Sequence, residues 1–158
     1  MTAVSSPSRS VEHGTIRLER LYKAKPQRVF AAWADSEARA KWDVPGRWVI
    51  TEQTFDFREG GREMKRFGPA GDPRFLAQAR YVDIVPGRRI VYSYGMTDRG
   101  EPISVSLTTV EFTPVAGGTR LMLVEQVSLL DGRDKLAHRE EGIASKLDKI
   151  GLLVSEAA

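Results

Sequence analysis

Seven strand-like segments are followed by one amphipathic stretch that closes the chain, and this order constrains the fold more than any other feature. The strand-like segments alternate apolar and polar residues, whereas the closing stretch, about residues 133–155, repeats apolar residues at helical spacing. A long twisted sheet with one long helix left over usually wraps that helix. We therefore expect an α+β protein with space for a small apolar ligand between sheet and helix.

The connections between the segments indicate an antiparallel sheet. The first strand, 15–22, precedes two short helices, the first opened by Pro26 and the second ended by Pro45–Gly46. The other six predicted strands are 48–57, 62–67, 75–85, 89–96, 103–113 and 119–129. Their turns, such as Gly117–Gly118, are too short for parallel crossovers. We expect one domain at 15–156 after a flexible Ser-rich leader at 1–14.

Composition excludes several classes of protein. The 158 residues are 41% hydrophobic and 28% charged, as in an ordinary globular domain, and the absence of cysteine excludes disulfides and thiolate chemistry. No apolar run is long enough to span a membrane, and 1–10 lacks the apolar core of a signal peptide, so we expect a cytoplasmic protein without a membrane partner.

The net charge of +3 does not indicate a nucleic-acid partner, because the basic residues are scattered among acids. The tightest basic clusters, Arg62–Lys65–Arg66 and Arg88–Arg89, are predicted to lie at hairpin ends. We therefore expect a solvated, mildly basic surface and no nucleic acid.

The closing stretch predicts a helix with one buried face. Its apolar residues recur at spacings of seven, four, three and four, and they are Leu136, Ile143, Leu147, Ile150 and Val154. Four charged residues of the same stretch are predicted to face water, and they are Arg139, Glu140, Lys146 and Lys149.

The order and spacing of several motifs resemble a known superfamily. The stretch Ala24-Lys-Pro-Gln-Arg-Val-Phe-Ala-Ala-Trp-Ala-Asp35, followed by Lys41-Trp42 and Pro45, resembles the opening of SRPBCC proteins, which include the START and birch-pollen-allergen-like proteins. Four later motifs resemble the branch named for the C-terminal domain of the chaperone ATPase activator: Phe55–Arg62, Val85–Tyr92, Gly117–Leu121 and Glu141–Leu147. The resemblance covers about residues 15–154. It implies a helix-grip fold, in which a seven-stranded antiparallel sheet curves around the last helix and two short helices plug one end.

Two positions depart from the family pattern. Lys25 stands where many relatives have Ser before the helix-opening Pro, so the capping of that helix must come from elsewhere. Ile143 stands where relatives often have Trp, which removes a large aromatic side chain from the expected cavity wall. The ligand preferences of relatives therefore do not transfer to this chain.

Strand alternation selects polar candidates for the cavity. Ser106 and Thr108 share the face of Val110, and Glu125 shares the face of Leu123. The two hydroxyls fit either a cavity with a partly polar lining or a solvent-exposed end of the strand. An acid among apolar neighbours is costly unless it is paired, so Glu125 is the best candidate for acid–base chemistry or for holding a polar ligand end. The structural alternative is a salt bridge to Arg20 or another strand arginine.

Aromatic and helix residues complete the predicted ligand-binding set. Tyr92 and Tyr94 share a strand face, Tyr81 lies on the preceding strand, and Trp42 is expected at the cavity mouth; core filling is the alternative for all four. The full set is Trp42, Tyr81, Tyr92, Tyr94, Ser106, Thr108, Glu125, Ile143 and Leu147.

The sequence supports no metal site and no cofactor. His13 lies in the predicted leader, and His138 with Glu141 forms a pair on the polar side of the closing helix. One usable histidine and no cysteine also give little support to a Ser-His-Asp or Cys-His mechanism.

Three functions remain open at this point. The first is a carrier or binding module for a small hydrophobic or amphipathic molecule, and the second is a small-molecule enzyme of the polyketide cyclase type that uses Glu125 or a tyrosine. The third, a partner of the chaperone ATPase, is implied only by the family's name. Exposed sheet edges in such a fold also invite a homodimer.

Overall fold

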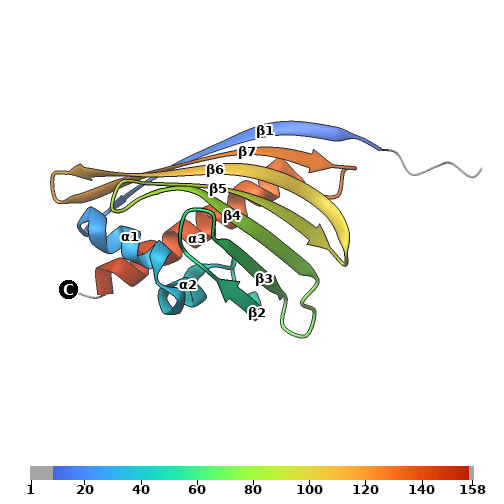
Figure 1. Ribbon diagram of the computed structural model, residues 1–158, viewed down its shortest axis with the longest axis horizontal. Helices are drawn as coiled ribbons and strands as arrows, with labels where there is room; N and C mark the ends of the chain where they lie inside the picture. Colours follow the sequence, from blue (N-terminus) through green and yellow to red (C-terminus); the bar gives the residue numbers. More distant parts are fainter. Residues whose placement is uncertain (1–8, 157–158) are drawn as a thin grey trace, which may run out of the picture.

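The computed structural model describes residues 9–156, in which one curved antiparallel sheet carries three helices on one face (Figure 1). The elements are, in chain order, β1 (Val11–Tyr22), α1 (Pro26–Ala34), α2 (Ser36–Trp42), β2 (Val49–Phe55), β3 (Arg62–Gly68), β4 (Phe75–Val85), β5 (Arg89–Asp98), β6 (Glu101–Val115), β7 (Gly118–Leu130) and α3 (Leu136–Glu156). The strand order β1-β7-β6-β5-β4-β3-β2 places the first strand beside the last. The predicted helix-grip fold is confirmed.

Three predicted boundaries are wrong. β1 begins at Val11, which pairs with Leu130, so residues 11–14 belong to the sheet and not to a leader; residues 1–8 lie outside the described part. The last hairpin turns at Ala116–Gly117, because Val115 pairs with Gly118 and Gly117 has a φ of 81°. α3 begins three residues later than predicted, because residues 131–135 form the connection from β7.

The two short helices are joined through a single residue. Asp35 ends α1 and also caps α2, where its carboxylate accepts a hydrogen bond from the backbone N–H of Ala38 at 3.2 Å. α1 opens at Pro26 after Lys25, whose side chain makes no capping hydrogen bond. The fixed φ of proline at the first helical position favours this start.

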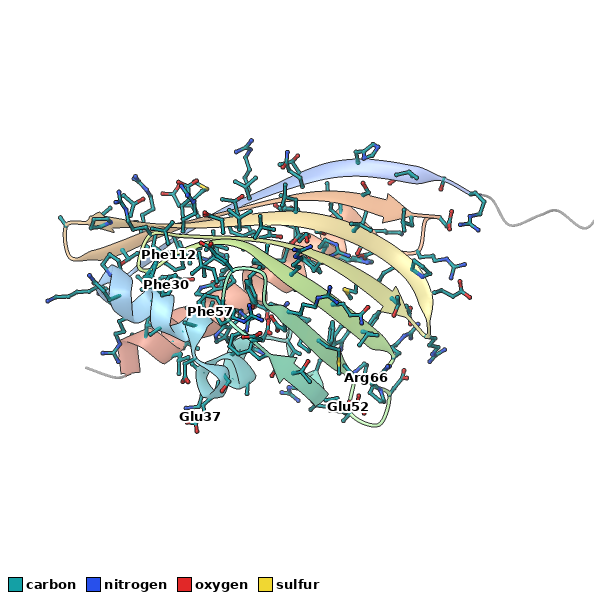
Figure 2. All side chains as sticks on the ribbon, in the orientation of Figure 1. Phe30, Glu37, Glu52, Phe57, Arg66 and Phe112 are labelled. Atoms are coloured by element: carbon teal, nitrogen blue, oxygen red, sulfur yellow. The ribbon has the colours of Figure 1, made fainter. Side chains whose placement is uncertain are left out.

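The core lies between the helices and the inner face of the sheet. Figure 2 shows Phe30 of α1 between Phe57 and Phe112, and its ring centroid is 5.7 Å and 5.4 Å from theirs. In α3, Ile143, Leu147, Ile150 and Val154 are buried as the stripe predicts, whereas Leu136 is only half-buried. The hydroxyl of Tyr22 donates to the carbonyl of Leu147 at 2.7 Å, which ties β1 to the middle of α3.

Within residues 9–156, no helix is long and apolar enough to cross a membrane. β1 and β2 are the two edges of the sheet, and the predicted homodimer stays a prediction.

We expect Gly118→Ala to lower the free energy of unfolding by roughly 2 kcal/mol or more, because a Cβ there would collide with the backbone carbonyl oxygen of Tyr22 in β1. Urea denaturation measures the loss. Gly95→Ala in β5 is the matched control, since the nearest atom to its Cβ would be the Ser104 carbonyl oxygen at 4.0 Å. Equal stability of the two variants would contradict the assigned contact between β1 and β7.

Candidate ligand-binding site

A cavity of about 680 Å³ lies among α3, α2, the segment that follows α2, and the inner face of the sheet. Its apolar wall comes from several elements and includes Trp33, Trp42, Phe67, Leu123, Ile143 and Leu147. Charged side chains complete the lining, and most of them belong to two buried clusters described below. The cavity is thus more polar than the sequence predicts.

Six of the nine predicted ligand-binding residues line this cavity: Trp42, Tyr92, Tyr94, Glu125, Ile143 and Leu147. Tyr81, Ser106 and Thr108 are buried but are not part of its lining. The part that each residue plays in ligand binding stays a prediction.

Trp42, which was predicted to lie at the cavity mouth, is the last residue of α2. Its indole N–H donates to the carbonyl of Ala32 at 2.8 Å, and its ring packs against Trp33 with a centroid distance of 4.7 Å. Only 2% of the residue is exposed, so Trp42 forms a fixed wall.

Glu125 of β7 lies at the centre of the first polar cluster, which we call the Glu125 cluster: Glu125, Tyr94, Ser106, Thr108 and Arg139. Tyr94 and Thr108 donate to one carboxylate oxygen at 2.7 Å and 3.2 Å. Ser106 and Arg139 donate to the other at 3.2 Å and 3.4 Å. Both oxygens of this buried carboxylate are therefore occupied by donors from the protein.

Arg139 pairs with Glu125 across the interface between α3 and the sheet, and two predictions were wrong here. Arg20 is not the partner, because it binds Asp148, and Arg139 does not face water. Position 139 lies three residues after Leu136 and four before Ile143, so helical spacing places it on the buried stripe. Asp134 also binds the Arg139 guanidinium, at 2.7 Å.

Burial, and then the neighbouring charge of Glu125, raises the pKa of Tyr94 well above its ordinary value. Tyr94 therefore stays protonated and serves as a hydrogen-bond donor. The Glu125 cluster thus holds a carboxylate in place, with both of its oxygens hydrogen-bonded to donors from the protein.

A second polar cluster, which we call the Asp43 cluster, consists of Arg39, Asp43, Glu63, Lys65 and Lys146. The Arg39 guanidinium binds Asp43 at 2.9 Å and Glu63 at 3.0 Å, while Lys65 binds Asp43 at 3.1 Å. Burial alone would raise the pKa of Asp43, but the charges of Arg39, Lys65 and Lys146 outweigh it and hold that pKa well below its ordinary value. Asp43 is therefore ionised and joins α2 to β3.

The Asp43 cluster was not predicted from the sequence. Lys65 does not lie at a hairpin end but in the middle of β3, with its side chain buried. Figure 2 shows its neighbour Arg66 beside Glu52 of β2, and the two side chains lie 3.7 Å apart. The sequence of β3 did carry a signal for this cluster, because strand alternation places Glu63 and Lys65 on the same face as Phe67.

Lys146 is the fifth member of the Asp43 cluster and lines the cavity, although it was predicted to face water. Its Nζ lies 3.8 Å from the nearest Asp43 carboxylate oxygen. Burial first, and the charge of Lys65 next, lower the pKa of Lys146 to about 7, against the opposing charge of Asp43.

In the part of the chain that the structure describes, no three His, Cys, Asp or Glu side chains are grouped so that they could hold a metal ion. His138 and Glu141 lie on the rim of the cavity, and His138 is exposed.

The sheet, the long C-terminal helix and the cavity between them together define a helix-grip protein of the SRPBCC type. Residues 23–155 match the family described as Activator of Hsp90 ATPase homolog 1-like protein. The chain belongs to this family.

Solved structures support the same assignment. A protein from Rhizobium loti is 45% identical, has a TM-score of 0.83, and the match covers 90% of this chain and 98% of that one. An uncharacterised protein from Rhizobium leguminosarum is 39% identical with a TM-score of 0.87, over 94% and 99% of the two chains. The AHSA1 protein from Silicibacter pomeroyi, 19% identical with a TM-score of 0.76 over 92% and 100%, shares the fold. No curated protein matches the chain.

We expect Arg139→Met to lower the free energy of unfolding by about 3–5 kcal/mol, because it leaves the buried Glu125 carboxylate without its cation. Adding Glu125→Gln removes the unpaired charge and should restore part of the loss. Chemical denaturation of both single variants and the double variant measures the coupling. Strictly additive losses would contradict the pairing.

We expect stability to rise with pH because of Lys146. Its pKa is about 7 in the folded protein and 10.5 in the unfolded chain, so between these values the unfolded state binds more protons. Below pH 7 both states are protonated and the full cost of burying the charge remains. Relative to Lys146→Met, the free energy of unfolding of the wild type should rise by up to about 1.4 kcal/mol per pH unit between pH 7 and 9. Urea unfolding at each pH tests this, and parallel curves for the two proteins would contradict it.

Proposed function

We propose that this protein binds a small, mostly apolar molecule in the cavity between the sheet and α3. The observation that carries the proposal is the cavity of about 680 Å³ with aromatic and aliphatic walls. Sites for small molecules typically enclose about 300–1,000 Å³ and combine an apolar lining with a few placed polar groups. Burial of a ligand against these walls contributes about 25 cal/mol per Å² of apolar surface.

The fixed character of the walls supports binding. Trp42 is anchored by its hydrogen bond to Ala32, and Tyr94 by its hydrogen bond to Glu125. Side chains that are already held in place lose little conformational freedom when a ligand enters, so less of the binding free energy is spent on ordering them.

The enzyme of the polyketide cyclase type is the alternative, and the hydrogen bonding of Glu125 favours the carrier over it. A general base needs a free lone pair within reach of the substrate proton. Four protein donors already surround the Glu125 carboxylate. Turnover that Glu125→Gln abolishes while ligand affinity is retained would reverse this preference.

Only the name of the family suggests an interaction with Hsp90. Titration of the chaperone with this protein, with ATPase rate as the readout, tests it. No change in rate at high excess would end this alternative.

We expect Ile143→Trp to weaken binding of the uncharged fluorescent probe N-phenyl-1-naphthylamine about tenfold or more, because the larger side chain fills part of the cavity. Leu152→Trp is the matched control, since Leu152 lies on the exposed face of the same helix. Fluorescence titration gives the affinities, and native mass spectra of fresh protein identify any retained ligand. Absence of saturable probe binding to the wild type, or equal affinity of the two variants, would refute binding in the cavity.

A further inference from the structure

Lys146 differs from the other charged members of the Asp43 cluster in its access to the cavity. Its side chain is 23% exposed, whereas the side chains of Arg39, Asp43, Glu63 and Lys65 are only 4–6% exposed. Its Nζ lies 3.8 Å from the nearest Asp43 carboxylate oxygen, a distance too long for a hydrogen bond. All five members line the cavity, and the Lys146 ammonium group is the one most exposed to a ligand there.

The Asp43 cluster also carries surplus positive charge. Three cations, from α2, β3 and α3, face the two carboxylates of Asp43 and Glu63. Those carboxylates are already bound by closer partners: Lys65 and Arg39 hold Asp43, while Arg39 and the Tyr81 hydroxyl hold Glu63. Among the described residues, Lys146 thus has only a share of the Asp43 carboxylate, at 3.8 Å, as its ion-pair partner.

The charged groups that face Lys146 explain why an anion is favoured there. Lys65 and Arg39 disfavour its protonated form, while Asp43 and Glu125 favour it. Burial and the nearby Lys65 outweigh the two acids and lower the pKa of Lys146 to about 7. A ligand anion against Nζ would supply the missing opposite charge, so binding and protonation would stabilise each other.

The surroundings of Lys146 also favour an apolar body for the ligand. Ile143, one turn before it on α3, and Leu147, next to it, line the same cavity, with Trp42 and Tyr92 from other elements. The nearby acids Asp43 and Glu63 would repel a second negative charge.

We infer that the ligand is an apolar molecule ending in one carboxylate or similar singly charged oxyanion, which Nζ of Lys146 binds. This inference rests on the proposed function, because it identifies the ligand class of the same cavity.

Two fluorescent probes with the same aromatic body test the inference at pH 6.5. 8-Anilinonaphthalene-1-sulfonate carries a sulfonate, whereas N-phenyl-1-naphthylamine is its uncharged counterpart. Lys146→Gln should raise the Kd of the sulfonate about tenfold, equivalent to about 1.4 kcal/mol, and change that of the neutral probe less than twofold. Lys146→Arg keeps the charge and should hold the Kd of the sulfonate within about threefold of the wild type.

Lys41→Gln removes the same charge from an exposed position on α2 and should leave both affinities unchanged. An unchanged sulfonate Kd in Lys146→Gln, or an equal loss in Lys41→Gln, would overturn the inference. Wild-type binding of the neutral probe separates the two proposals. If that probe binds and the sulfonate is indifferent to Lys146, only the anion site fails; if neither probe binds, the proposed function fails as well.

Discussion

The burial of one face of α3 against the sheet is the constraint on which the rest of the structure depends. Leu147 and Ile150 are almost completely buried, and the Tyr22 hydroxyl holds the helix backbone at Leu147. The same helix carries Arg139 in its first turn and Lys146 at its middle, on or beside the buried stripe. One helix therefore packs along the inner face of the sheet (Figure 1) and also forms a wall of the cavity.

Two buried polar clusters accompany this packing, and each joins elements that are distant in the sequence. Arg139 brings α3 to Glu125 of β7, and Arg39 brings α2 to Glu63 of β3. Taking such charges out of water costs several kcal/mol per ion, so each buried carboxylate needs its cation. The clusters fix the positions of the cavity walls at the cost of some stability.

Local periodicity explains which parts of the site could be predicted. Alternation along β6 and β7 correctly placed Ser106, Thr108 and Glu125 on the inner face, because side chains alternate between the two faces of every strand. The same rule, applied to β3, would have found Lys65. The prediction for Lys65 was wrong because a charged residue was assumed to face water. A charged side chain can be buried when another element supplies its partner, as Asp43 does here.

The sequence by itself determined the α+β class, the order of the strands along the chain and the buried stripe of α3, because these depend on spacings within single segments. Only the tertiary structure decided that Glu125 pairs with Arg139, that Tyr81 lies outside the cavity lining, and that Lys146 reaches the cavity with surplus charge. Those outcomes depend on distances between residues from different elements. The curvature of the sheet and the position of the helix set these distances, and no local pattern encodes them.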